Sequence, residues 1–195
     1  MYFRAEEFIN NEKRYCLWLV DASPSELRSC KEIIPRIETI RTFRANSKAA
    51  AIRKFAEPPI LFSQITQADT DYIIIPGVSS GRRRYVPIGF FDKETIASNL
   101  VQIISDATLY YFGVLTSNVH IAWMRAVCDR LEMRYRYSKD IVYNNFPWST
   151  LANEQKAKIE QTDQAILDAR ALYPDSSLAD LYDETTMFLE LRKSH

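Results

Sequence analysis

Residues 72–91 read YIIIPGVSSGRRRYVPIGFF, so two apolar runs flank a stretch rich in serine, glycine and arginine. The run Tyr72–Ile75 is short and rich in β-branched residues, which is typical of a buried strand. The run Tyr85–Phe91 predicts a second strand, and Pro76 and Pro87 favour edge or bulge positions. Together the two runs predict a β-hairpin with an arginine-rich loop.

Upstream of the hairpin, the sequence predicts one more strand and a set of helices. The apolar run Tyr15–Val20 predicts a buried strand. Ser23 and Pro24 are a capping hydroxyl and a first-turn proline, so we expect a helix from there to about Ile34. The stretches that follow predict a helix opened or broken at Pro35 and running to Arg44, then a short helix capped by Asn46 or Ser47 that reaches Ala56 and ends before Pro58.

Downstream of the hairpin, strand and helix signals alternate up to about residue 148, and after it the sequence predicts helices only. The expected elements are a strand at Leu100–Ile104, an amphipathic helix at Asn118–Leu131, and a strand at Arg134–Tyr137 paired with Ile141–Tyr143. A polar helix capped by Asn153 ends at Pro174, and a shorter one runs from Ser176 to about Tyr182. We therefore predict an α+β fold, with a mixed or antiparallel sheet and packed helices over residues 1–148, followed by an incomplete helical segment over residues 149–195.

Composition limits the class of protein. The chain has 195 residues, 47% of them hydrophobic and only 4 glycine, which indicates a packed domain rather than a disordered tail. No apolar run is long enough to span a membrane, and Met1 opens no signal peptide. Cys16, Cys30 and Cys128 are not spaced as metal ligands and indicate free thiols in a reducing compartment, so we expect a cytoplasmic protein without a metal site.

The net charge is zero, but the charges are unevenly placed along the chain. Eight basic and two acidic residues between Arg28 and Lys54 give this stretch a charge of +6, whereas nine acidic and five basic residues from Leu151 onward give −4. Such asymmetry suggests that only the basic part faces an anionic partner. The stretch is either a helical face that follows phosphates or a solvated amphipathic face.

The triplet Arg82–Arg84 behind Ser79 and Ser80 is the most suggestive local feature. An arginine fork matches guanine O6 and N7, or a phosphate, with two hydrogen bonds, and serine hydroxyls can fix the backbone. Strand alternation places Arg82 and Arg84 on one face and Arg83 on the other. The alternative is a solvated turn with ordinary surface arginines.

Two other features admit a binding role or a structural one. Arg134–Tyr137 interleaves charges and aromatic rings, as in a strand on nucleic acid, or as in a half-buried strand with both tyrosines in the core. His120 has no nearby cysteine or second histidine, which favours an ordinary core or surface position. Asn144–Trp148 resembles the Asn-Pro-Pro-Tyr motif of amino-methyltransferases, but it lacks the proline pair and the tyrosine that follows.

Tests for enzymatic machinery fail. The sequence has no glycine-rich nucleotide loop, no nucleophile elbow and no cluster of metal ligands. We therefore expect no catalytic residue and no metal ligand in this chain, and no enzymatic activity from it alone.

Six segments, in the same order, resemble one family, the single-chain Type IIG and Type IIL restriction–modification methyltransferases of the Mme-like group. Each segment is a weak signal by itself, but six in order are specific, and they extend over essentially the whole chain. The segments are Glu6–Asn10, Arg14–Leu19, Ser47–Lys48, Val78–Phe90, Asn144–Trp148 and Leu178–Asp183.

The resemblance implies a place for this chain in a larger enzyme. In the family, a nuclease and a helical connector precede an adenine-N6 methyltransferase that uses S-adenosylmethionine, and a target-recognition domain and a helical C-terminal region follow. This chain resembles the last two parts. The implied partners are double-stranded DNA and the methyltransferase domain of the parent protein, and the implied cofactor belongs to the parent and not to this chain.

The resemblance also implies which residues contact DNA. They are Ser47, Lys48, Arg53, Ser79, Ser80, Gly81, Arg82, Arg83 and Arg84. Relatives commonly have an acidic residue at the position of Gly81, so no base preference carries over. The chain also departs from its relatives at Thr186–Phe188, where they have prolines, and then stops early, as a fragment or remnant would. The alternative function is therefore a non-catalytic protein-interaction module or an inert remnant of such an enzyme.

Overall fold

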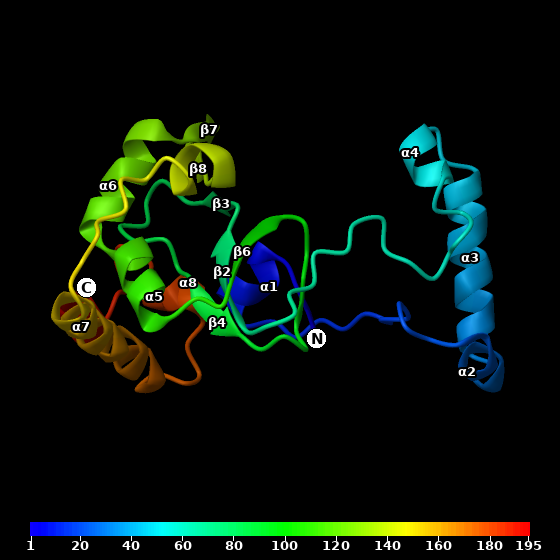
Figure 1. Cartoon of the computed structure of the whole chain (residues 1–195), viewed down its shortest axis with the longest axis horizontal. Helices are drawn as coiled ribbons and strands as arrows, with labels where there is room; N and C mark the ends of the chain where they lie inside the picture. The colour runs from blue at the N-terminus through cyan, green and yellow to red at the C-terminus, as the bar shows by residue number, and fades with distance from the viewer. The chain divides into compact units, whose positions relative to one another are not determined.

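The computed structural model describes all 195 residues, and they form two compact units. The first, here called the α/β unit, contains Met1–Tyr15 and Thr66–His195. The second, here called the helical unit, contains Cys16–Ile65 (Figure 1). All strands belong to the α/β unit, and the chain is an α+β protein with a helical C-terminal segment, as predicted.

Strand β2 (Tyr72–Pro76) is the centre of the α/β unit. It pairs antiparallel with β4 (Gly89–Phe91) on one side and with β6 (Val101–Ser105) on the other. The predicted hairpin and the predicted strand near residue 100 are thereby confirmed. The second hairpin strand is shorter than expected and pairs only from Gly89 onward, since Pro87 has no N–H to donate to a ladder.

The two faces of β2 pack into two different cores. Ile73 and Ile75 belong to the larger core, which includes residues of α5 (Leu109–Thr116) and α6 (Asn118–Val127). Tyr72 and Ile74 belong to the smaller core, beside α1 (Ala5–Asn10). Because successive strand side chains point to opposite faces, one fully buried strand serves both cores. Figure 1 shows α1 on one side of β2 and the pair α5–α6 on the other.

A buried carboxylate fixes the N-terminal segment. Strand β1 (Tyr2–Phe3) pairs parallel with β5 (Ile96–Ala97) just before α1. Glu7 of α1 accepts hydrogen bonds from the guanidinium groups of Arg4 and Arg14, each as short as 2.8 Å. These bonds, first that from Arg4, lower the pKa of Glu7 to about 2. The charge is therefore paired across the physiological pH range.

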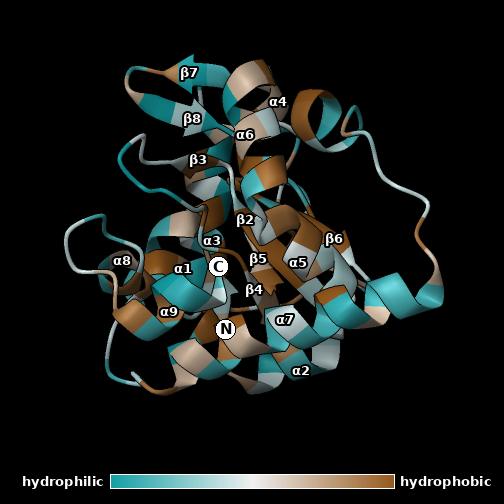
Figure 2. Ribbon diagram, turned by 90° about the vertical axis from the view of Figure 1, so that its left-hand side faces the viewer, coloured by the Kyte–Doolittle hydropathy of each residue, from teal (hydrophilic) through white to brown (hydrophobic).

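A third small sheet contains β3 (Val78–Ser79), β8 (Arg134–Arg136) and β7 (Asp129–Leu131) in that order. The predicted strand at residues 134–137 is confirmed. The helix predicted to reach Leu131 instead ends at Val127, because residues 129–131 form β7. Figure 2 shows the β7–β8 hairpin mostly in the teal of polar residues and the region around β2 in brown.

The strand predicted at Ile141–Tyr143 is wrong. A π-helix spans Lys139–Tyr143, and the hydroxyl of Ser138 accepts a hydrogen bond from the N–H of Ile141 at its start. Only Val142 is buried in it, and its carbonyl accepts a hydrogen bond of 2.9 Å from the Trp123 indole. A three-residue apolar run carries no periodicity, so sequence alone does not separate a strand from a helical turn here.

Three helices form the C-terminal part: α7 (Asn153–Ala171), α8 (Leu178–Leu181) and α9 (Leu189–Ser194). Helix α7 packs against α5 and buries Ile166 and Ala169. Its cap is Ala152, not Asn153, and the side chain of Gln155 accepts a hydrogen bond from the Ala152 N–H.

The helical unit contains α2 (Pro24–Ser29), α3 (Ile33–Ala45) and α4 (Ala50–Arg53). The Ser23 cap is confirmed, with its hydroxyl accepting a hydrogen bond of 3.3 Å from the Glu26 N–H. The first helix is shorter than expected and ends at Ser29. The strand predicted at Tyr15–Val20 is wrong, because this stretch pairs with no other strand, and its Trp18 packs on Phe62 at 5.3 Å between ring centroids.

Candidate nucleic-acid interface

The segment from Ser79 to Arg84, here called the arginine loop, leaves β3 as a turn. The N–H of Arg83 donates to the carbonyl of Ser80 at 3.3 Å, and the N–H of Arg82 donates to the Ser80 hydroxyl at 3.3 Å. Arg82 and Arg84 are exposed and Arg83 is half-buried. Arg82 and Arg84 thus differ from Arg83 in exposure, as predicted, but the prediction assumed a strand and the backbone here forms a turn.

The charges of the arginine loop are not neutralised within the chain. None of the ion pairs in the structure includes Arg82, Arg83 or Arg84. Burial lowers the pKa of Arg83, and the carboxylate of Asp183 acts in the opposite direction. The guanidinium of Arg84 lies 5.4 Å from the centre of the Tyr85 ring. Two exposed, unpaired guanidinium groups at a fixed turn are suited to bind an anion or a base edge.

Arg125 of α6 anchors this loop. Its Nη2 donates to the carbonyl of Arg83 at 3.0 Å and to the carbonyl of Arg84 at 3.2 Å. Its guanidinium also lies 5.7 Å from the centre of the Tyr135 ring, on β8. The loop backbone is thus tied to a helix more than forty positions away in sequence. Sequence reasoning missed Arg125, because an arginine on the polar side of a helix carries no distinguishing signal.

Ser79 and Gly81 support the loop from inside the fold and do not present a side chain to a ligand. Ser79 is only 4% exposed, pairs with Tyr135 in the sheet, and leaves its hydroxyl without a hydrogen-bond partner. A Cβ at Gly81 would overlap the carbonyl oxygen of Met133, in the connection between β7 and β8. Glycine at this position therefore permits a close approach of the two backbones. Of the predicted loop residues, Arg82 and Arg84 present their side chains most openly.

A cavity of about 630 Å³ opens beside the arginine loop within the α/β unit. Arg82 and Arg84 line it from the loop, Arg125 from α6, and Arg192 from α9. Glu184 supplies the one carboxylate in its lining. Arg192 was not predicted, because the final residues were expected to be an unfinished segment rather than a helix.

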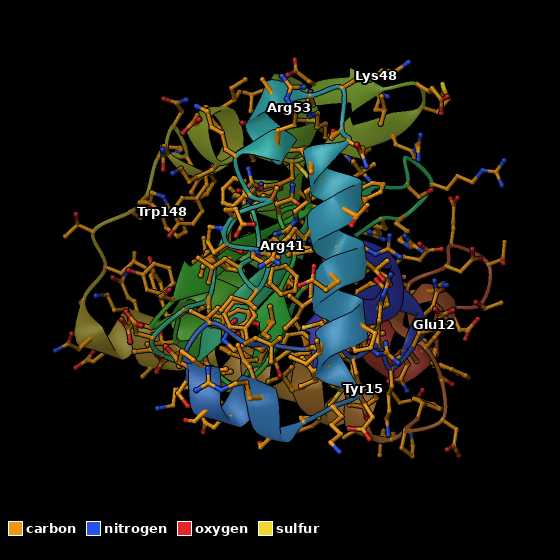
Figure 3. The ribbon with its side chains drawn as sticks, turned by 90° about the vertical axis from the view of Figure 1, so that its right-hand side faces the viewer. Glu12, Tyr15, Arg41, Lys48, Arg53 and Trp148 are labelled. Carbon is orange, nitrogen blue, oxygen red and sulfur yellow. The ribbon has the colours of Figure 1, made fainter.

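The remaining predicted residues come together in the helical unit, at the connection between α3 and α4. The Nη1 of Arg53 donates to the carbonyls of Ser47 at 2.8 Å and Lys48 at 2.9 Å. Lys48 itself is exposed. Figure 3 shows Lys48 and Arg53 at the same end of this unit, with Arg41 lower on α3. The predicted residues therefore form two groups, one in each unit.

The basic stretch from Arg28 to Lys54 is not uniformly available to a partner. Arg41 pairs with Glu38 at 2.8 Å and with Glu57 at 3.0 Å. The guanidinium of Arg44 donates to three backbone carbonyls of its own unit, among them that of Phe55 at 2.9 Å. Together with Arg53, three of the eight basic side chains thus stabilise the fold of the unit. The others remain on the surface.

Histidine, cysteine, aspartate and glutamate side chains form no group of three that could hold a metal ion, and no helix is both long and apolar enough to cross a membrane. The three cysteines are free thiols. His120 is buried and shares a hydrogen bond of 3.0 Å with the Tyr137 hydroxyl, so it occupies a core position.

Comparison with known proteins gives consistent results. Residues 1–150 match the family model of the MmeI target recognition domain, and residues 146–195 match that of the MmeI C-terminal domain. The chain is 39% identical over 189 residues to DNA methyltransferase A of Bacillus subtilis (strain 168), covering 97% of this chain and 21% of that protein. A solved structure of the Type IIL restriction–modification enzyme MmeI in complex with DNA is 46% identical, with a TM-score of 0.96 over all of this chain and 26% of that one.

Proposed function

Because this chain belongs to the family of MmeI target recognition domains, we propose that it is a sequence-specific recognition module for double-stranded DNA. One observation carries the proposal: Arg82 and Arg84 project unpaired from a turn whose backbone is fixed by Arg125. The similar MmeI chain was solved in complex with DNA, which supports the same ligand for this fold.

In the proposed complex, the arginine loop enters the major groove. An arginine there can donate two hydrogen bonds to guanine O6 and N7, and a neighbouring arginine can hold a phosphate. Since Arg125 already orders the loop backbone, little conformational entropy is lost on binding. Lys48 and the Arg53-supported turn of the helical unit would add phosphate contacts. Ser79 would act only by supporting the loop from within the sheet.

We also propose that the chain works beside a methyltransferase domain of a larger restriction–modification protein. It spans 21% of DNA methyltransferase A, so most of such a protein lies outside it. The partner domain would transfer a methyl group from S-adenosylmethionine to the N6 of an adenine flipped into its own pocket. This chain would supply no reacting group and hold no cofactor. Its contribution would be to place the target base.

A titration of fluorescent duplex DNA over a range of salt concentrations tests the binding proposal. If about six phosphates are contacted, the logarithm of the affinity should fall against the logarithm of salt with a slope of roughly −5. A flat salt response, or no binding even at low salt, would contradict the proposal and favour a protein-interaction module or a remnant.

Selection of duplexes from a randomised pool tests base recognition by the loop. Changing a base-contacting arginine, Arg82 or Arg84, to alanine should relax the preference at one base pair, at a cost of about 1–3 kcal/mol. Lys158→Ala, an exposed cation on α7, is the matched control and should leave the selected sequences unchanged. If both arginine variants select the same sequences as the wild type, the loop does not read bases.

A further inference from the structure

We propose that the cavity lined by Arg82, Arg84, Arg125 and Arg192, here called the arginine cavity, seats a phosphate of the DNA backbone. The consequence is that α9, in the C-terminal region, contributes directly to DNA binding through Arg192. The inference rests on the proposed function and adds a site and a residue that the loop alone does not provide.

The charge of the cavity is the first observation. Four guanidinium groups meet one carboxylate, that of Glu184, and no ion pair in the structure includes any of the four arginines. Cations that converge around a partly enclosed space repel one another unless an anion joins them. Arginine is the side chain whose planar fork matches phosphate oxygens with two hydrogen bonds.

The second observation is that the lining is held in place. Arg125 is fixed by its two hydrogen bonds to the loop carbonyls and by the Tyr135 ring. Arg84 lies over the ring of Tyr85, which is buried in the larger core and also stacks on the His195 ring with centroids 4.0 Å apart. Prepositioned cations lose little freedom when an anion binds, so the cavity is suited to binding rather than to solvation alone.

The third observation concerns Arg192. Its helix is docked by Leu191, which is fully buried in the larger core, so the neighbouring Arg192 is carried to the cavity by a rigid element. The Arg192 side chain forms no ion pair within the chain. Arg192 is therefore held at the cavity by a fixed helix, and no carboxylate of the chain pairs with its charge. This arrangement is suited to binding an anion.

The ligand follows from the place of the cavity. Arg82 and Arg84 belong both to its lining and to the arginine loop, so a duplex read by the loop passes its backbone across the opening. At about 630 Å³, the cavity accepts a phosphate together with its sugar and ordered water. A phosphodiester and free inorganic phosphate bind arginine through the same hydrogen bonds. We assign the cavity to the phosphodiester, because the duplex bound by the arginine loop brings one to its opening.

The test compares Arg192→Gln with Lys193→Gln in the whole chain. Both changes remove one positive charge from α9, but Lys193 does not line the cavity. Duplex affinity is measured from 50 to 300 mM salt, and melting temperatures establish that both variants fold. Arg192→Gln should weaken binding to all sequences alike, about tenfold at low salt, and should flatten the salt slope by about 0.9. Lys193→Gln should change neither.

The outcomes separate the inference from the proposed function. If the wild type binds DNA and the two variants bind it with equal affinity, the arginine cavity does not bind a DNA phosphate. The recognition proposal then still stands. If the wild type binds no duplex, the proposed function fails. Inorganic phosphate is then the second probe: if it raises the melting temperature of the wild type but not of Arg192→Gln, the cavity takes free phosphate, and the assignment to DNA is overturned.

Discussion

Replacing Asp163 by asparagine should stabilise the α/β unit at alkaline pH and have little effect at acidic pH. Asp163 lies on α7, is only 6% exposed, and has one carboxylate oxygen without a hydrogen-bond partner. It packs so closely on α5 that a Cβ at Gly113 would overlap its carboxylate. Burial first, and then the nearby Glu160, raise the pKa of Asp163 to about 7.

The magnitude follows from the two protonation states. The pKa rises from 3.8 in an unperturbed aspartate to about 7 in the fold, so the carboxyl destabilises the folded state as pH rises between these values. A difference of about three units corresponds to at most about 4 kcal/mol above pH 7. Structural relaxation and water penetration reduce such penalties. We therefore expect Asp163→Asn to gain about 2 kcal/mol at pH 8 and to differ from the wild type by less than about 1 kcal/mol at pH 4.

Urea unfolding at a series of pH values measures this difference. In a Trp18→Phe background the fluorescence comes from Trp123 and Trp148, both in the α/β unit. Subtracting the wild-type free energy from that of Asp163→Asn cancels other titrating groups. Asp168→Asn, an exposed carboxylate of the same helix, is the control and should give a flat difference. A flat difference for Asp163→Asn as well would refute the assignment of a buried carboxyl group with a raised pKa.

Three further results are expected from single substitutions. Gly81→Ala should cost about 1–3 kcal/mol in urea unfolding, because its methyl group overlaps the carbonyl of Met133; an unchanged midpoint would mean that the two backbones separate freely. Burial lowers the pKa of His120 to about 4, so its contribution to stability is lost as pH falls from about 6.5 to 4; His120→Gln should make the stability profile less steep in that window, leaving the slope from His195, whose pKa burial lowers to about 3, and a slope equal to that of the wild type would contradict this. Arg125→Ala should weaken duplex binding about tenfold, because it releases the loop and removes one cation from the arginine cavity, whereas Arg130→Ala, which removes a cation from the Tyr135 ring without a contact to the loop, should have a smaller effect.

Sequence reasoning succeeded where the signal is local. The β-branched run at Tyr72–Ile75 predicted the central strand, and Ser23 predicted a helix start, because strand preference and capping depend on residues within a few positions. These features needed no knowledge of tertiary contacts.

The predictions failed where the residues close in sequence do not determine the structure. Helix α5 has the sequence LYYFGVLT, whose lack of charged residues leaves no amphipathic period to detect. The run Tyr15–Val20 looked like a strand because it is apolar, but no neighbouring strand exists to accept its backbone hydrogen bonds. The arginine cavity combines Arg82 with Arg192, and only the tertiary fold brings positions that far apart together.

The position of β2 has a consequence for how the chain opens. Since alternate residues of this strand are buried in both cores, neither core can come apart while the strand stays in place. Amide protons of Ile73, Ile74 and Ile75 should therefore exchange with solvent only when the α/β unit unfolds as a whole. The arginine loop starts shortly after this strand ends, at Ser79. Local unfolding at the edges of the unit should therefore leave the start of the arginine loop in place. The position of the loop is then as stable as β2, the strand that we expect to open last.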